Sequence, residues 1–545
     1  MPSEQPFSED TSSSETPELA TSDVAIPSPD QPQGTTRPAV TRPAVTRNAI
    51  TLMIGTLASR VSGLVRTSLL LQLFPVTMTD AFLVAWKIPN LFRELLAEGA
   101  LTNSFVPVYA SLKGDDAKKL TAALTVSLAI INSLLLVLAL YAAPWLVDLM
   151  LAEGSSVNVT LAVQLTRLTF PVLFAISLAA LAMGVLNAEE RFFAPAWAPV
   201  ALNIAVILGM LLFPANVHAL ALSVVAGGLL QLLVQLPSLW RHRLIPTRWQ
   251  LWHPQLLDVL LLMAPFALTT GARQVLNVVA NYQLSLLPAG SVTAYENANL
   301  LVSLALGLFS VSPALAFYSR LSQQATHAPD NFASTLLSGC KLISFLTAPV
   351  GLLMLVLAEP AVRTIWDIRL ASGQSQTIQY TILAVVPLGL AIFPLGLNNL
   401  LLRPFYIRKQ VRTVIAISVG FMGLSAVLYA LLVPGLGIAG LSVTTALVNW
   451  LQLATLLLWL RRTERLELLT FTRHAARVWL AASAAAFITW GLIINLPDAK
   501  SWLQIVLRVG LGGCIGLGCY GIFALLLNLS EVQQLKNRFL RQPSD

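Results

Sequence analysis

Apolar stretches longer than 20 residues recur along the chain, and they restrict its fold more than any other feature. One of them, LTVSLAIINSLLLVLALYAAPWLV, begins at Leu124. A transmembrane helix needs about 20 apolar residues, whereas a strand of a transmembrane β-barrel alternates over about 10. Charged residues make up 11% of the chain, against roughly 25% in soluble domains, and the mean hydropathy is +0.72. The sequence therefore predicts an all-α polytopic membrane protein and excludes soluble enzymes and secreted disulfide-rich proteins.

Fourteen apolar segments follow one another from Asn48 onward, beginning near residues 48, 79, 120, 158, 194, 216, 255, 290, 331, 376, 411, 436, 474 and 501. The 34 Lys and Arg residues alternate between the connecting loops: 23 lie on one side, three on the other and eight inside helices. Loops that are rich in Lys and Arg are normally cytoplasmic. We therefore expect about 14 transmembrane helices with both termini cytoplasmic, and we assign the net charge of +8 to cytoplasmic loops rather than to nucleic-acid binding.

Residues 1–46 differ from the rest of the chain. They are rich in Ser, Thr, Pro and acidic residues, a composition that cannot bury a hydrophobic core. They also lack the basic start and the apolar run of a signal peptide. This region is predicted to be a disordered cytoplasmic tail.

Ionisable residues inside the membrane gather in the first two predicted spans. A charge at the centre of a transmembrane helix costs at least about 2.5 kcal/mol, so it is retained mainly where it faces a cavity or a partner. At about 100° per residue, one face of the second span carries a polar stripe, formed by Asp80, Lys87, Asn90, Glu94 and Glu98. Lys87 and Glu94 could instead form an internal ion pair that only fixes helix packing. Arg93 lies about 120° from the stripe, so either Arg93 faces a cavity while the stripe packs against the first span, or the reverse.

Three arginines in these spans, Arg60, Arg66 and Arg93, outnumber the acidic residues available to neutralise them. The planar guanidinium fork matches phosphate oxygens, which favours a multivalent anion such as a pyrophosphate as the ligand. The histidines are scattered and the three cysteines lie in apolar stretches. We therefore expect no metal site, no disulfide and no cofactor.

Transport fits the sequence better than catalysis. The longest outer loop, about residues 358–376, has no paired-acid or metal-binding pattern, and there is no P-loop for ATP. Prolines interrupt several apolar segments, as expected of helices that bend during alternating access. Small residues at Gly512 and Gly516 predict a close approach between helices near the end of the chain.

The segment from Ser59 to Lys113, SRVSGLVRTSLLLQLFPVTMTDAFLVAWKIPNLFRELLAEGALTNSFVPVYASLK, resembles the lipid II flippases of bacterial peptidoglycan synthesis, the MurJ (formerly MviN) family. Two further blocks are similar to the same family: GVLNAEERFFAPAWAPVALN from Gly184 and GGLLQLLVQLPSL from Gly227. The similarity covers the first six spans well and the last eight mainly by length and hydropathy.

The resemblance implies the fold of the multidrug/oligosaccharidyl-lipid/polysaccharide exporter superfamily, with two six-helix lobes in a V and two extra helices. The corresponding regions are a tail over 1–46, a first lobe over 47–250, a second lobe over 251–470, two extra helices over 471–530 and a cytoplasmic tail over 531–545. It also implies a cationic central cavity that takes the pyrophosphate and sugars of lipid II, and a groove near the last two helices for the polyprenyl tail.

Carried over by motif, Arg60, Arg66 and Arg93 would bind the head group, while Asp80, Asn90 and Glu98, with Lys87 and Glu94 of the same stripe, would form a gating or polar network. The sequence departs from the family pattern in the eighth span. Where the family carries an arginine in a context like YADRL, this chain reads YENANLL, with Leu300 at the corresponding place. Arg273 in the seventh span is a candidate to compensate, and an ion pair between Arg273 and Glu296 is the structural alternative.

The leading hypothesis is a flippase, not an enzyme, that moves lipid II from the inner to the outer leaflet by alternating access. Its partners would be lipid II or a related polyprenyl-pyrophosphate glycolipid, membrane lipids and cell-wall synthesis proteins, but no nucleic acid. One alternative is a flippase for another polyprenyl-pyrophosphate-linked oligosaccharide, an O-antigen or exopolysaccharide unit, which the missing arginine at Leu300 favours. Another is a non-transporting scaffold for a cell-wall complex.

Overall fold

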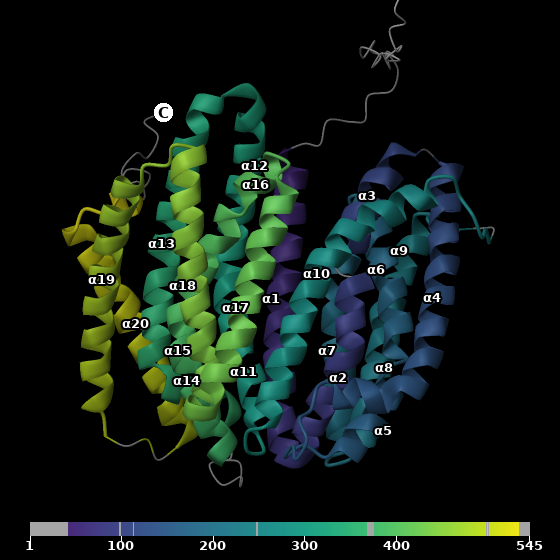
Figure 1. The fold of residues 1–545 in the computed structure, drawn as a ribbon, viewed down its shortest axis with the longest axis horizontal. Coiled ribbons are helices and arrows are strands. Elements are labelled where there is room, and N and C mark those ends of the chain that lie inside the picture. Colours follow the sequence, from purple (N-terminus) through teal and green to yellow (C-terminus); the bar gives the residue numbers. More distant parts are fainter. Residues whose placement is uncertain are drawn as a thin grey trace, which may run out of the picture. The chain divides into compact units, whose positions relative to one another are not determined.

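The computed structural model describes residues 42–96, 100–112, 114–246, 249–367, 375–497, 499 and 501–533. Within these ranges every regular element is helical (Figure 1). Every described helix belongs to one unit, Asn48–Asp545, except the start of α1, which precedes Asn48. Residues 1–41 of the predicted N-terminal tail and 534–545 of the predicted C-terminal tail lie outside the described residues.

The helices of the first part of the chain are α1 (Arg42–Leu73), α2 (Val76–Leu96), α3 (Ala100–Ser111), α4 (Asp115–Asp148), α5 (Val159–Thr169), α6 (Val172–Ala188), α7 (Phe193–Leu212), α8 (Val217–Leu233) and α9 (Leu236–Arg241). α1 begins inside the segment predicted to be a tail, with Pro43 in its first turn, where a missing backbone N–H costs no helical hydrogen bond.

The helices of the second part are α10 (Leu256–Ser285), α11 (Ser291–Leu306), α12 (Ser312–His327), α13 (Phe332–Val356), α14 (Ala358–Trp366), α15 (Ser375–Leu401), α16 (Arg403–Ile407), α17 (Val411–Leu436), α18 (Ile438–Thr463), α19 (Leu468–Ile494) and α20 (Trp502–Leu526). A π-helical turn, Gly307–Val311, joins α11 to α12, and a 3-10 turn, Pro329–Asn331, precedes α13.

Each of the fourteen predicted segment starts lies within six residues of the start of a helix. Polar side chains cap several of these starts. Asn158 accepts a hydrogen bond from the backbone N–H of Leu161 before α5, and Asn216 accepts one from Ala219 before α8. Such caps satisfy N–H groups that have no partner within the helix, and they stabilise helix starts that the sequence analysis placed from apolar segments alone.

Among the described residues, ten helices are long and apolar enough to cross a membrane, or eleven if the bent pair α5 and α6 forms one span. α1, α2 and α10 are not in this set, although α1 has 32 residues and α10 has 30. α1 and α2 carry the three arginines and the polar stripe, which lowers the hydropathy of these two helices. The all-helical membrane fold is thus confirmed, and the count of fourteen stays a prediction that depends on these helices.

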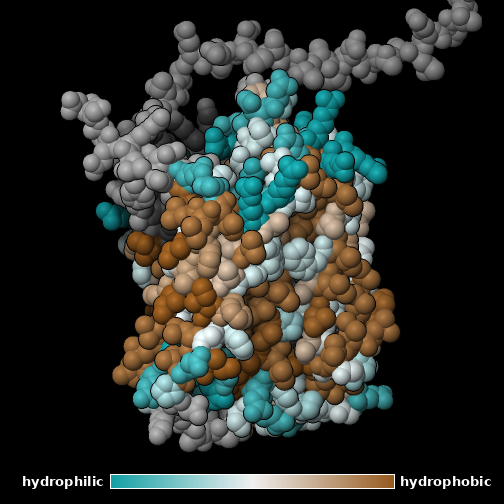
Figure 2. Space-filling view, turned by 90° about the vertical axis from the view of Figure 1, so that its left-hand side faces the viewer, coloured by the Kyte–Doolittle hydropathy of each residue, from teal (hydrophilic) through white to brown (hydrophobic). Residues whose placement is uncertain are grey.

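The outer surface is apolar where the protein would contact lipid. Figure 2 shows a largely hydrophobic band between two more hydrophilic ends. α4 contributes Leu134, Leu138, Tyr141 and Trp145 to the exposed apolar residues, and the last side chain is 75% exposed. A soluble protein does not expose so many large apolar side chains, because their contact with water is unfavourable. Lipid is the solvent that suits this surface.

The main hydrophobic core joins helices from both parts of the chain. Phe74 after α1 and Phe82 on α2 belong to the same buried cluster as Val292 on α11 and Trp366 on α14. Polar contacts accompany this packing at the end of the bundle where α1 finishes. The Ser68 hydroxyl donates to the carbonyl of Ile365, and the Ser156 hydroxyl donates to the carbonyl of Leu287 at 2.9 Å. This end of the structure is therefore closed by direct contacts between the two parts.

Candidate functional site

A cavity of about 660 Å³ lies among α1, α2, α6, α7, α8 and α11. Arg60, Arg66 and Arg93 all line it, together with Asn90. None of its described lining residues is acidic. The structure thus brings together the three arginines that the sequence analysis selected, and we call this space the arginine cavity.

A side-chain amide on α7 orients Arg66 of α1. Arg66 Nη1 donates to Asn203 Oδ1 on α7 at 3.1 Å. The Asn203 amide in turn donates to the carbonyl of Ser59 and to Ser62 Oγ, at 3.1 and 3.0 Å. Because a neutral amide and not a carboxylate holds Arg66, its positive charge is not neutralised by this partner.

Arg60 extends towards the second part of the chain. A Cβ atom added at Gly307, where the π-helical turn begins, would lie 3.2 Å from Arg60 Nη2. A side chain at position 307 would therefore press on the guanidinium. The absence of a side chain at Gly307 leaves Arg60 room beside α11.

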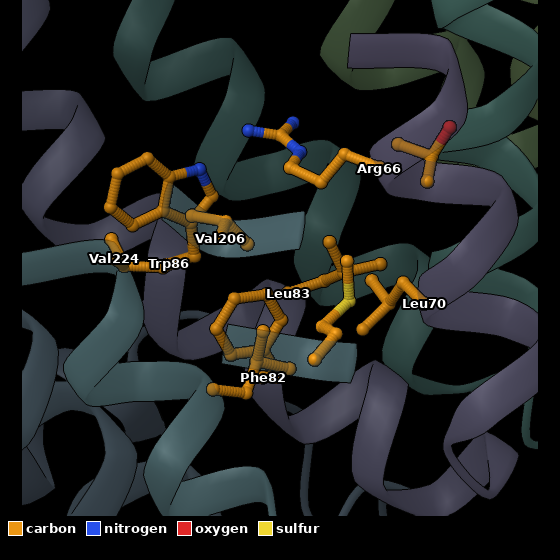
Figure 3. A pocket seen from close by; sticks show the side chains of 10 residues that line it. Arg66, Leu70, Phe82, Leu83, Trp86, Val206 and Val224 are labelled. Atoms are coloured by element: carbon orange, nitrogen blue, oxygen red, sulfur yellow. The ribbon is translucent and has the colours of Figure 1, made fainter. Parts of the chain in front are cut away.

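A small apolar pocket of about 30 Å³ adjoins the arginine cavity (Figure 3). Arg66 and Trp86 line both spaces, and in the close-up their nitrogen-bearing groups lie on one side of the pocket while Phe82 lies on the other. The remaining walls are mostly apolar, with Leu70, Leu83, Val206, Met210, Leu220 and Val224. The arginine cavity thus ends against apolar packing in the direction of the closed end of the bundle.

The sequence left two arrangements of α2 open, and the structure matches neither in full. Arg93 lines the arginine cavity, as in the first arrangement, but the described residues of the polar stripe make polar contacts with α10 and α11 and not with α1. Lys87 Nζ forms an ion pair with Glu296 on α11 at 2.5 Å and donates to Asn281 Oδ1 on α10 at 2.6 Å. Glu94 accepts a hydrogen bond from Gln274 Nε2 on α10 at 2.5 Å. The helical periodicity correctly places these residues on one face of α2, but only the tertiary structure shows which helices that face contacts.

The alternative ion pair between Lys87 and Glu94 is also not what the structure shows. Lys87 pairs with Glu296, while Glu94 Oε1 accepts from Asn90 Nδ2 at 3.2 Å. The proposed ion pair between Arg273 and Glu296 is likewise replaced by the one with Lys87. Arg273 is exposed and is not among the residues that line the arginine cavity.

Asp80 lies away from the arginine cavity, at the start of α11. Its carboxylate accepts hydrogen bonds from the backbone N–H of Gly290 at 2.5 Å and of Thr293 at 3.0 Å, and from the Thr293 hydroxyl at 2.5 Å. A carboxylate at a helix N-terminus satisfies free N–H groups and complements the helix dipole. Asp80 thus links α2 to α11 at the closed end of the bundle.

Glu98 and Leu300 are the two remaining positions that the sequence analysis singled out. Glu98 lies outside the described residues. Leu300, at the place where the family pattern has an arginine, lines the arginine cavity. The departure from the pattern therefore falls on the wall of the candidate site.

The sequence analysis missed several polar side chains of this cavity, among them Asn187, Asn203 and Gln231. Each lies in or beside an apolar segment, and single amides of this kind are common in membrane helices. The available signal was that Asn187 and Asn203 belong to the block GVLNAEERFFAPAWAPVALN. Without the fold, nothing showed that these amides face Arg60 and Arg66.

Two curated proteins show which family this chain is similar to. A chain from Burkholderia cenocepacia described as lipid II flippase MurJ is 32% identical over 424 residues, which cover 75% of this chain and 82% of that protein. A chain from Vibrio cholerae described as probable lipid II flippase MurJ is 29% identical over 503 residues. The match covers 87% of this chain and 94% of that protein.

Solved structures share the fold. A lipid II flippase MurJ in an inward closed conformation superposes with a TM-score of 0.75 at 22% identity, over 88% of this chain and 99% of that one. An inward-facing multidrug transporter of the MATE family superposes with a TM-score of 0.65 at 16% identity, over 77% and 98%. The family model described as lipid II flippase MurJ matches residues 72–507. With its arginine-lined cavity and this match over most of its length, the chain belongs to the MurJ family of lipid II flippases.

Proposed function

We propose that this chain moves lipid II from the inner to the outer leaflet of the bacterial cytoplasmic membrane by alternating access. The observation that carries the proposal is the arginine cavity, in which three guanidinium groups face a common space without an acidic lining residue among those described. A pyrophosphate carries several negative charges on oxygens that accept paired hydrogen bonds from guanidinium. Arg60, Arg66 and Arg93 would hold this group, and membership of the MurJ family supports lipid II as the substrate.

The position of the cavity supports entry from the cytoplasmic side. It reaches Asn187 near the end of α6 and Pro195 near the start of α7, next to the loop of Arg191 that the charge distribution predicts to be cytoplasmic. At its other end lie the apolar pocket and the cap that Asp80 forms on α11. Translocation would require this second end to open while the first closes, which is where Asp80 would act as a gating residue.

An apolar groove of about 420 Å³ supports a path for the polyprenyl tail. It lies between α15, α18 and α19 and is lined by Phe393, Trp450, Leu453, Leu457, Phe471, Thr472, Ala475, Ala476 and Trp479. An apolar chain needs no polar partner, so it can stay in the membrane beside this groove while its charged head group enters the cavity. The polar and apolar parts of one substrate would then bind at separate surfaces.

The test is lipid II exposure on the outer leaflet of a bacterium depleted of its own flippase. We expect this chain to restore exposure and Arg93→Ala to reduce it at least tenfold at equal membrane levels, because the variant loses a charge-assisted hydrogen bond to the pyrophosphate. The matched control is Arg412→Ala, an exposed arginine in the first turn of α17 that lies outside the cavity.

The outcomes separate lipid II transport from the competing functions. A scaffold without transport activity would restore lipid II exposure with neither chain. Failure of both chains, with correct membrane insertion, would therefore favour a scaffold or a flippase for another polyprenyl-pyrophosphate-linked oligosaccharide. In that case Leu300 is the first position to examine, because it lines the cavity where the family pattern has an arginine.

A further inference from the structure

A second cavity of about 270 Å³ adjoins the arginine cavity and shares Trp86 and Asn90 with it. It lies between α2, α10 and α11. Its polar lining consists mainly of side-chain amides, from Asn90, Gln274, Asn277, Asn281 and Asn299, and we call it the amide compartment. Two adjoining spaces with such different walls suit two chemically different parts of one ligand.

The charges of the amide compartment disfavour a pyrophosphate. Its described lining includes one cation, Lys87, and two carboxylates, Glu94 and Glu296. Lys87 is already paired with Glu296 at 2.5 Å, and its side chain is only 18% exposed. A phosphate placed here would meet the carboxylate of Glu94 with no unpaired cation among these residues. The negative part of a ligand would therefore prefer the arginine cavity.

A chain of hydrogen bonds holds the amides in place. Asn277 Nδ2 donates to Gln274 Oε1 at 3.0 Å, and Gln274 Nε2 donates to Glu94 Oε2 at 2.5 Å. Asn90 Nδ2 donates to the other oxygen of Glu94 at 3.2 Å. Side chains oriented by their neighbours lose less conformational entropy when a ligand binds. Asn277 is exposed, so its amide is open to a ligand in the compartment.

Aromatic residues complete the walls. Trp86 stands where the two cavities meet, and Tyr295 lines the amide compartment from α11. An aromatic ring offers an apolar face, and an amide both donates and accepts hydrogen bonds. A sugar ring has the complementary features: C–H groups on its faces, and hydroxyl or acetamido groups at its edge that donate and accept. Uncharged N-acetylated sugars therefore match this compartment.

We propose that the amide compartment binds the N-acetylated sugars of the lipid head group while the adjoining arginine cavity binds its pyrophosphate. The inference rests on the proposed function and assigns the two parts of the head group to separate sets of residues. Asn277 on α10 and Asn299 on α11 are the specificity-determining residues, because both line the compartment without lining the arginine cavity.

The test compares two ligands on the full chain purified in detergent: lipid II from which the peptide has been removed, so that the pyrophosphate carries the sugars alone, and undecaprenyl pyrophosphate, which lacks the sugars. The double variant Asn277→Ala/Asn299→Ala should bind the peptide-free lipid II about tenfold more weakly, the value expected for two lost hydrogen bonds, and should bind undecaprenyl pyrophosphate as the unchanged chain does. The matched control is Gln323→Ala, an exposed amide on α12 outside both cavities.

Retained binding of undecaprenyl pyrophosphate also shows that the variant is folded. Equal weakening of both ligands would overturn the inference, because the amides would then act on the pyrophosphate or on the fold. Unchanged binding of both ligands would overturn it as well. If the unchanged chain binds undecaprenyl pyrophosphate but gains no affinity from the sugars, the assignment of the sugars fails while the pyrophosphate site stands. If it binds neither ligand, the proposed function itself fails.

Discussion

At the scale of single residues, this chain separates charge that lines a cavity from charge that is paired within the structure. Lys87 is used internally, since it pairs with Glu296, and Asp80 caps α11. Arg66 is oriented by a neutral amide, that of Asn203. Formal charge alone does not show which of these residues are paired and which are not. Their partners make the difference, because an ion pair cancels a charge and an amide does not.

Leu300 provides a prediction at this scale. It lines the arginine cavity, so Leu300→Arg would add a fourth guanidinium to the same space. We expect the variant to bind undecaprenyl pyrophosphate about tenfold more tightly, because a new charge-assisted hydrogen bond outweighs repulsion from the other arginines once the anion is present. The measurement is a binding titration in detergent, with Leu300→Met as the volume-matched control. Affinity equal to that of the control would mean that position 300 does not reach the pyrophosphate.

At the scale of elements, the helices are positioned by close packing at small residues as much as by apolar area. A Cβ atom added at Gly516 on α20 would collide with the side chain of Leu353 on α13 and lie 2.9 Å from Thr489 Oγ1 on α19. A Cβ atom added at Gly512 would likewise lie 2.7 Å from the Leu357 side chain. The small-residue spacing on α20 therefore serves close helix packing, as the sequence indicated.

Gly516→Val should destabilise the protein, because the added atoms must push α20 away from α13 and α19. Overpacking of this kind costs about 1–3 kcal/mol. Gly518→Val is the matched control on the same helix, since nothing lies within 4 Å of a Cβ atom added at Gly518. Thermal unfolding in detergent should show a lower Tm for Gly516→Val only. Equal Tm values for the two variants would show that α20 does not pack as described.

At the scale of the whole molecule, we expect the arginine cavity to make the transport cycle sensitive to membrane voltage. When the cavity is empty, three guanidinium groups without an acidic lining residue among those described would move relative to the field between inward-facing and outward-facing states. One charge crossing the full field is worth about 2.3 kcal/mol per 100 mV. A potential that is negative inside therefore favours return to the inward-facing state.

Transport by the purified chain in lipid vesicles should accordingly be faster with an imposed inside-negative potential than without one. The measurement is the rate of lipid II appearance in the opposite leaflet, with and without a potassium diffusion potential. Even a tenth of the field acting on one charge changes an equilibrium by about 1.5-fold at 100 mV. Equal rates under both conditions would show that reorientation of the empty cavity does not move these charges across the field.

The sequence by itself determined the class of the fold and the approximate starts of fourteen of its helices. Long apolar segments can satisfy their backbone groups in lipid only as helices, and this requirement is local. It also selected Arg60, Arg66 and Arg93, because charge inside a membrane is costly and is retained mainly for a purpose. These conclusions depend on residue type and spacing along one chain.

Only the tertiary structure decided which neighbouring helix each polar face contacts. It directed the polar stripe of α2 towards α10 and α11 instead of α1, paired Lys87 with Glu296, and placed Leu300 on the wall of the arginine cavity. The periodicity of a helix specifies the relative directions of its side chains but not the neighbour that each direction meets. That neighbour is set by contacts between segments about 200 residues apart, such as Lys87 with Glu296. The sequence of a single helix does not specify such contacts.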